Sequence, residues 1–129
     1  MGSGATFTIA KFGKWAFVDE VAGVKILTKK EKRENEPDST PRFSHTANTM
    51  YARMDDDKKK VVQIAVYRNH EKIKDIEWGH FHKNTDGTTF KKGEVHVQEY
   101  VNGQRNRDGR LPTEEEKELA RIVKEWHNG

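Results

Sequence analysis

Three histidines in the second half of the chain combine a residue type and a spacing that can do chemistry. His80 and His82 form an H-x-H motif, and His96 follows inside the segment H-V-Q-E-Y. Alternate side chains of a β-strand point to the same face, so His80 and His82 share a face of a predicted sheet. A turn at residues 84–87 predicts that this strand pairs with the strand that carries His96. The sequence therefore predicts that the three imidazoles converge on one patch.

The first chemistry open to such a cluster is acid–base catalysis. The unperturbed pKa of histidine, about 6.5, lets one imidazole take a proton while another gives one near neutral pH. Metal-free RNA cleavage needs a base for the 2′-hydroxyl, an acid for the departing 5′-oxygen and a cation for the charge on phosphorus. We predict His80 and His96 as the acid–base pair, with His82 as the orienting or substituting partner. The predicted phosphate contacts are basic residues near them: Lys83, Arg105 and Arg107.

The second chemistry is the binding of a metal ion such as zinc. Three imidazole nitrogens with a fourth position open form a typical catalytic zinc site. No carboxylate takes an obvious ligand position, since only Glu94 and Glu99 are near neighbours in the sequence. We therefore expect no cofactor, and a zinc site formed by His80, His82 and His96 is the alternative. A third interpretation is structural, with exposed histidines on a strand and a partly buried His96.

Three predicted strands provide the surroundings of the cluster. They cover residues 60–68, 72–83 and 94–101, with apolar and polar positions alternating. One face of the resulting sheet is rich in valine and packs against the core. The opposite face holds aromatic, amide and imidazole side chains, as a substrate cleft does. It comprises Tyr67, Trp78, His80, His82, His96, Gln98 and Tyr100. A bulge at Gly79 would reverse the orientation of the H-x-H motif.

On this face we predict two kinds of substrate contact. The aromatic rings of Tyr67, Trp78 and Tyr100 are suited to stacking on a nucleobase. The Gln98 amide can donate a hydrogen bond to phosphate.

The whole chain, residues 1–129, is predicted to form a single α+β domain. Its main element is a curved antiparallel sheet of about six strands, with short strands at residues 6–12, 14–19, 24–28 and 49–54 preceding the three above. Residues 29–42 hold two of the three prolines and almost nothing apolar, which predicts an exposed loop.

A C-terminal amphipathic helix is predicted at residues 113–127. Thr113 and Glu116 have the spacing of a capping box. Apolar side chains then recur at helical spacing, at Leu119, Ile122, Val123 and Trp126. This helix is expected to lie on the sheet.

The composition excludes several classes of protein and favours one kind of partner. The chain has no cysteine, which excludes disulfides and thiolate metal sites. No apolar run reaches membrane-spanning length, so we expect no membrane partner. The net charge is +3, and the basic residues gather in separate clusters, a distribution that suits a polyanion such as RNA.

Four short motifs also resemble those of a known family. They read V-V-Q-I-A-V-Y at residues 61–67, D-I-E-W at 75–78, G-H-F-H at 79–82 and H-V-Q at 96–98. In this order they resemble a mainly-β group among the C-terminal nuclease domains of bacterial polymorphic toxins of the Rhs and contact-dependent inhibition types. The family pattern ends in a second histidine where this chain has Gln98.

The resemblance implies an RNase that is secreted as an effector, acts in the cytoplasm of a target cell and is neutralised by a cognate immunity protein. Glutamine cannot exchange protons, so the acid–base pair falls to His96 with His80 or His82. We therefore expect a metal-independent endoribonuclease toxin domain. The main alternative is a non-enzymatic basic binding or inhibitor protein of phage or plasmid type.

Overall fold

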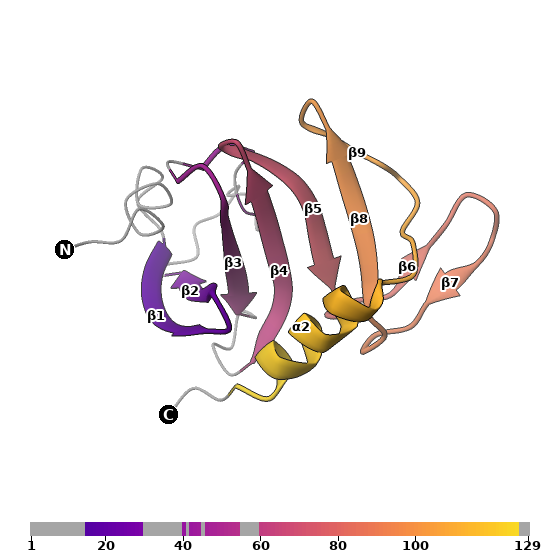
Figure 1. The fold of residues 1–129 in the computed structure, drawn as a ribbon. Coiled ribbons are helices and arrows are strands. Elements are labelled where there is room, and N and C mark those ends of the chain that lie inside the picture. The colour runs from indigo at the N-terminus through magenta and orange to yellow at the C-terminus, as the bar shows by residue number, and fades with distance from the viewer. Residues whose placement is uncertain (1–14, 30–39, 41, 45, 55–59, 127–129) are drawn as a thin grey trace.

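The structure, a computed structural model, describes residues 15–29, 40, 42–44, 46–54 and 60–126. Its main element is a sheet of seven strands with the order β1-β2-β3-β4-β5-β8-β9, and one helix packs on it (Figure 1). The sheet strands are β1 (Trp15–Val21), β2 (Val24–Lys29), β3 (Thr49–Met54), β4 (Val61–Arg68), β5 (Glu71–Glu77), β8 (His96–Val101) and β9 (Gln104–Arg105). The predicted α+β class is confirmed.

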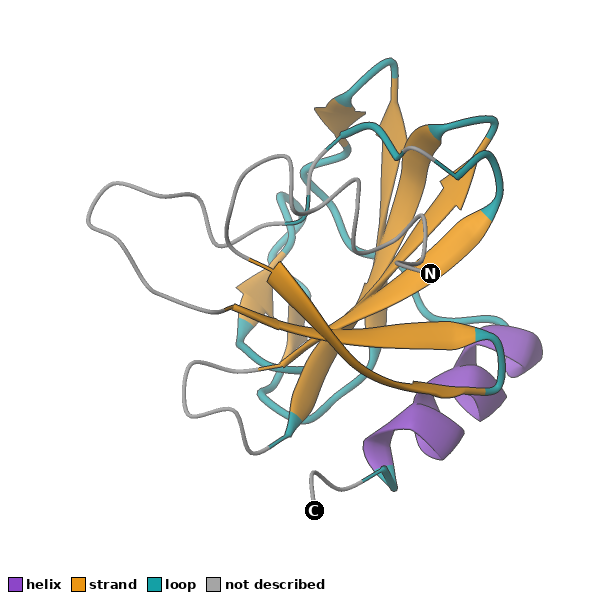
Figure 2. Cartoon of the chain, turned by 90° about the vertical axis from the view of Figure 1, so that its left-hand side faces the viewer, coloured by secondary structure: helices purple, strands orange, loops and turns teal. Residues whose placement is uncertain are grey.

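The sheet differs from the prediction in size and in one pairing. It has seven strands rather than about six, and β2 and β3 are parallel whereas every other neighbouring pair is antiparallel. The sheet is not closed, but it curves strongly around its own axis, with the helix against one side (Figure 2). The strand expected at residues 6–12 lies outside the described residues.

A small hairpin follows β5 and stands beside the main sheet. Its strands are β6 (His82–Lys83) and β7 (Thr89–Phe90), joined by the predicted turn at residues 84–87. We expected this turn to pair the H-x-H strand with the His96 strand. Instead β6 pairs with β7, and β8 pairs with β5, so that His96 lies opposite Glu77.

The helix α2 (Glu114–Lys124) begins where the sequence predicts. Thr113 is the N-cap, and its side chain and that of Glu116 form both hydrogen bonds of the capping box. The helix ends at Lys124, before the predicted residue 127, because the backbone N–H groups of Glu125 and Trp126 close the last turn on Arg121 and Val123. Residues 127–129 lie outside the described part.

Both faces of the central strands are buried. The side that we call the helix face contains the main core, which is formed by Val24, Ile26, Ala52, Met54, Val61, Ile64, Ile76, Trp78, Val97, Ala120 and Val123. The other side, which we call the polar face, has a small apolar cluster of Leu27, Tyr51, Ala65 and Tyr67. Beside this cluster it buries polar side chains: Gln63, Lys72, Asp75, Glu77, His96 and Gln98.

The prediction for residues 29–42 has a partial outcome. The predicted exposed loop at 29–42 lies mostly outside the described residues, but Lys29 ends β2 and Thr40 is buried. Within the described part of the chain, no helix is both long and apolar enough to cross a membrane.

The helix is tied to the sheet through the buried carboxylate of Glu116. Arg110 donates two hydrogen bonds to it, at 2.8 and 3.0 Å, and the Lys74 ammonium on β5 lies 2.7 Å away. Burial alone would raise the pKa of Glu116, but these cations and the Thr113 N–H outweigh it and hold the pKa well below its usual range. The ionised form of Glu116 therefore stabilises the fold.

Glu116→Gln should test this link, because glutamine at the same position keeps the capping box but removes the charge. We expect a loss of roughly 2 kcal/mol in unfolding free energy at neutral pH. The folded-state pKa lies below that of the unfolded chain, about 4.3, so the stabilisation is complete above that pH and disappears as the pH falls below it. Urea unfolding from pH 7 to pH 3 should therefore show the difference from wild type shrinking.

Glu115→Gln is the matched control, because Glu115 is exposed in the same helical turn. It should cost roughly 0.5 kcal/mol or less. A Glu116→Gln deficit that stays constant down to pH 3 would contradict the proposed role of the charge.

Candidate functional site

The site begins where β5 stops. The predicted strand 72–83 breaks after Glu77, and residues 78–81 are irregular before β6 starts at His82. The break occurs where Gly79 passes close to β4: an added Cβ at Gly79 would lie 2.7 Å from the Cβ of Val62. Only glycine allows this approach without displacing the chain.

Because the strand breaks here, some of its side chains lie on a different face from the one predicted. Trp78 was expected on the face of the histidines, but it lies in the main core on the helix face. Its indole N–H donates to the Val61 carbonyl at 3.0 Å, and Lys124 lies over its ring. The residues of β5 on the polar face are instead Asp75 and Glu77. Trp78 is therefore a core residue and does not line the predicted cleft.

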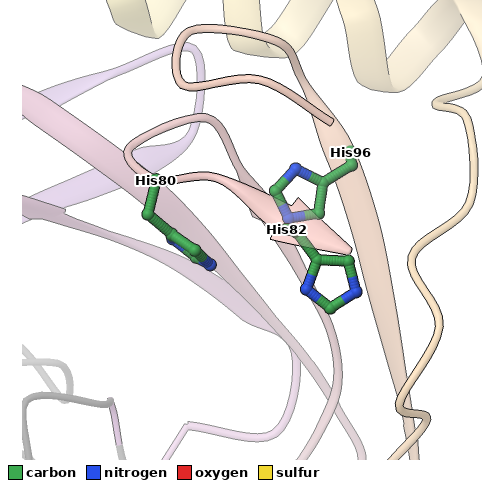
Figure 3. A group of neighbouring side chains, drawn as sticks. All are labelled: His80, His82 and His96. Carbon is green, nitrogen blue, oxygen red and sulfur yellow. The ribbon is translucent and has the colours of Figure 1, made fainter. Parts of the chain in front are cut away.

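The three histidines nevertheless converge, as predicted. One ring nitrogen from each of His80, His82 and His96 can be chosen so that all three lie within 4.8 Å of one another. The rings of His82 and His96 are nearly parallel, with centroids 5.3 Å apart, and His80 meets His96 edge-on at 5.6 Å (Figure 3). They come from three places: the loop after β5, β6 and β8.

The three histidines differ in solvent exposure, and the exposure decides which ring a substrate can reach. The His80 side chain is 53% exposed and His82 is half-buried, whereas His96 has no exposed surface. The ring of Phe90 on β7 stacks on His96 at 5.0 Å. We expected His96 to contact the substrate, but its burial restricts direct contact to His80 and His82.

The chain at Gly109 packs against the rings of the cluster. An added Cβ at Gly109 would lie 3.1 Å from the His96 ring and 3.5 Å from the His82 ring. The side-chain amide of Asn84 holds this segment in place, because it accepts from the Gly109 N–H at 2.8 Å and donates to the Gly109 carbonyl at 3.0 Å. The hairpin and this segment thus clamp the rings between them.

Glu77 is the site residue that the sequence analysis missed. Its Oε2 lies 3.4 Å from Nε2 of His96 and 3.6 Å from Nε2 of His80, and its side chain is almost completely buried. Burial alone would raise the pKa of Glu77, but the His96 contact and the charges of His80, His96 and Arg105 lower it below its usual range. A buried carboxylate thus joins an exposed imidazole to a buried one. The sequence did not indicate it, because unbroken alternation along residues 72–83 puts Glu77 on the face opposite His80 and His82, and only the break at Gly79 brings them together.

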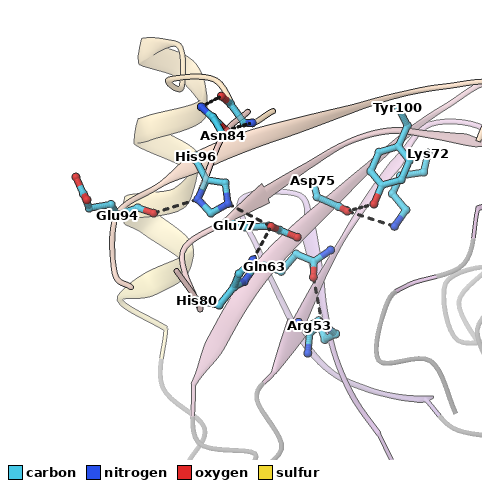
Figure 4. A network of polar contacts seen from close by, with 11 residues as sticks. Arg53, Gln63, Lys72, Asp75, Glu77, His80, Asn84, Glu94, His96 and Tyr100 are labelled. Atoms are coloured by element: carbon cyan, nitrogen blue, oxygen red, sulfur yellow. Dashed lines mark hydrogen bonds and ion pairs between the residues drawn. The ribbon is translucent and has the colours of Figure 1, made fainter. Parts of the chain in front are cut away.

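The polar face continues from Glu77 into a second charged group (Figure 4). The Asp75 carboxylate accepts a hydrogen bond from the Tyr100 hydroxyl at 2.7 Å and lies 3.4 Å from the Lys72 ammonium. Burial raises the pKa of Asp75, with Lys72 and Tyr100 opposing it. Burial likewise lowers the pKa of Lys72, with Asp75 opposing it. Both shifts favour the neutral forms, in contrast to Glu77.

Several buried polar atoms at the site have no hydrogen-bond partner among the residues that the structure describes. They are the Nε2 atoms of His82 and His96, Oε2 of Glu77 and both amide atoms of Gln98. Native proteins pair most buried polar groups, so each exception needs an explanation, such as a catalytic role or a bound water or ion. Five of the eight such atoms in the described residues lie together at this site.

The other predicted substrate residues divide into two groups. Tyr67 is buried against Tyr51, and Gln98 is fully buried on the polar face. Tyr100 is half-buried, whereas Lys83, Arg105 and Arg107 are exposed. The surface that a substrate can reach therefore includes His80, His82, Tyr100 and these basic residues, with Gln98 beneath.

The close approach of Gly79 to Val62 predicts the effect of Gly79→Ala. The new Cβ would lie 2.7 Å from the Cβ of Val62, so the backbone of residues 78–81 has to move and His80 with it. We expect a loss of about 1–3 kcal/mol in unfolding free energy, measured by urea denaturation. Adding Val62→Ala should not restore stability, because alanine keeps the clashing Cβ.

Gly87→Asn serves as the control for Gly79→Ala. Nothing lies within 4 Å of a Cβ at Gly87, and asparagine tolerates its φ of +92° better than most residues do. Its stability should fall by about 1 kcal/mol through backbone strain alone, with no overlap of atoms. A Gly79→Ala variant as stable as the wild type would contradict the close packing at Gly79.

The chain matches no family model, no curated protein and no solved structure.

Proposed function

We propose that the protein is a metal-independent endoribonuclease whose catalytic centre is the cluster of His80, His82, His96 and Glu77. The observation that supports it best is the contact of one buried carboxylate with both an exposed and a buried imidazole. A carboxylate beside an imidazole fixes the orientation of the ring and the nitrogen that carries its proton, an arrangement that acid–base catalysis uses.

In the proposed mechanism His80 and His82 are the acid–base pair. Glu77 faces Nε2 of His80 and favours a proton there, which leaves Nδ1 to take the proton of a 2′-hydroxyl. His82 then donates a proton to the departing 5′-oxygen. His96 does not touch the RNA and acts as a positioning residue, because it packs on His82 and holds Glu77.

The motifs that resemble toxin nucleases add support. Each motif contributes to the polar face or to the cluster: Gln63 comes from the first, Asp75 and Glu77 from the second, His80 and His82 from the third, and His96 and Gln98 from the fourth. We therefore propose that the protein acts as a toxin module in the cytoplasm of a target cell and that an immunity protein blocks its cleft.

A zinc hydrolase is the second candidate, and the buried Nε2 atom of His82, which has no partner among the described residues, favours it. Nitrogens that bind one tetrahedral zinc ion through bonds of about 2.1 Å lie about 3.4 Å apart. Here the nitrogens spread over up to 4.8 Å, and the His82 and His96 rings face each other in parallel instead of aiming at one point. This ring arrangement makes acid–base catalysis the first candidate.

RNA cleavage by purified protein tests the proposed centre. His80→Ala and His82→Ala should each reduce the rate by about 10²–10⁴-fold, since each removes one acid–base group. Glu77→Gln should lower kcat with little change in KM, because Glu77 does not touch the RNA. His70→Ala, outside the cluster, is the matched control and should retain the wild-type rate.

Full cleavage by His80→Ala, or no cleavage of any RNA by the wild type, would overturn the ribonuclease proposal. In the second case growth of bacteria that express the protein is informative. Growth arrest is expected from a toxin, whereas harmless accumulation points to the non-enzymatic binding protein.

Removal of metal separates the two candidates. Cleavage should continue in the presence of EDTA, and mass spectrometry of the native protein should find no stoichiometric zinc. If EDTA abolishes cleavage and zinc but not magnesium restores it, the histidine cluster is the centre of a zinc hydrolase.

A further inference from the structure

A hollow of roughly 1080 Å³ lies between the diverging ends of β5 and β8. The two strands pair only from Lys74 opposite Glu99 to Glu77 opposite His96. Beyond Lys74 they separate, as Figure 1 shows, and β9 pairs with the far side of β8. The hollow is open to solvent and is lined from both strands and by the end of β4.

The charges that line the hollow are unbalanced in favour of cations. Lys74 and Glu99, which both line it, are engaged with Glu116 and Arg110 respectively. The remaining charged lining residues are two exposed arginines, Arg68 and Arg105, and neither forms an ion pair with another described residue. Exposed guanidinium groups without a carboxylate partner are well suited to phosphate.

The other lining residues fit a polynucleotide rather than a simple anion. Tyr100 presents an aromatic ring that is half-buried, and the Lys72 ammonium lies 4.7 Å from the ring centroid. The side chains of Asn102 and Gln104 add exposed amides, which can pair with sugars and base edges. An aromatic ring beside arginines is typical of single-stranded nucleic-acid binding.

The hollow is connected to the histidine cluster through β8. Tyr100 lines the hollow and also donates its hydroxyl to Asp75 on the polar face. Tyr100 lies four positions after His96 on the same strand, a distance of about 13 Å. The positive charge of Arg105 also helps to lower the pKa of Glu77, which places Arg105 within electrostatic range of the cluster.

We propose that this hollow binds the backbone of single-stranded RNA, with Arg68 and Arg105 as phosphate contacts, and so leads the strand to the histidine cluster. The proposal rests on the ribonuclease function for its choice of ligand. The hollow supplies affinity, and the cluster supplies the chemistry.

The test measures binding of a fluorescent 2′-O-methyl oligoribonucleotide to the native protein, because this probe lacks the 2′-hydroxyl nucleophile and is not cleaved. Each phosphate contact on a single strand contributes about 0.7 to the slope of log K against log salt. Arg68→Ala and Arg105→Ala should each reduce the slope by about that amount and weaken binding roughly fivefold to tenfold at low salt. The double variant should lose about 1.4 from the slope.

Arg121→Ala is the matched control, since it removes the same charge from an exposed position on α2. Its slope should equal that of the wild type. Slopes for the Arg68 and Arg105 variants equal to that of the wild type would overturn the proposal. Binding of duplex RNA as tight as that of the single-stranded probe would also overturn it. Competition by inorganic phosphate at the concentration of the oligonucleotide would also overturn it, because it would identify a small-anion site.

The two proposals fail in different ways. The wild type could cleave no RNA while the arginine variants reduce the salt dependence of binding. That result would support the RNA-binding hollow and contradict the ribonuclease proposal. If the protein cleaves RNA through His80 but the arginine variants leave the slope unchanged, the ribonuclease proposal stands and the binding hollow is contradicted.

Discussion

The arrangement of the site depends on one physical constraint, the burial of the Glu77 carboxylate inside a sheet. An ionised carboxylate removed from water is costly unless nearby positive groups and hydrogen bonds compensate it. Here the compensation comes from His96, directly opposite on β8, and from His80, just beyond the end of β5. The same strand register places Ile76 and Trp78 on the helix face, so the core and the site are specified by one set of pairings.

The polar face holds two carboxylates in contrasting states. Asp75 and Glu77 are two residues apart on β5, yet burial raises the pKa of Asp75, whereas the imidazole contacts lower that of Glu77. Neighbouring acids whose environments move their pKa values in opposite directions are a recurring feature of acid–base sites. In this protein the contrast follows from the neighbours of each acid. Asp75 lies beside Lys72, whose pKa is lowered by burial, whereas Glu77 lies beside two imidazoles.

The sequence predicted the local elements better than their pairing. The capped helix and most strands follow from short-range patterns, and the parity of β8 correctly placed His96, Gln98 and Tyr100 on one face. Trp78 was misplaced because the strand breaks at Gly79, where the cause is the approach of Val62 from another strand. Glu77 was missed for the same reason: unbroken alternation along residues 72–83 puts it on the face opposite His80 and His82, and the break at Gly79 brings those histidines to its side.

The most direct test of the central claim is a long-range ¹H–¹⁵N spectrum that reports the protonation of each histidine ring nitrogen. If Glu77 holds both imidazoles, Glu77→Gln should shift the ring-nitrogen resonances of His80 and His96. The resonances of His70, whose Nδ1 contacts the Ser44 carbonyl, should stay unchanged. Unchanged His80 and His96 resonances in a folded Glu77→Gln protein would contradict the account.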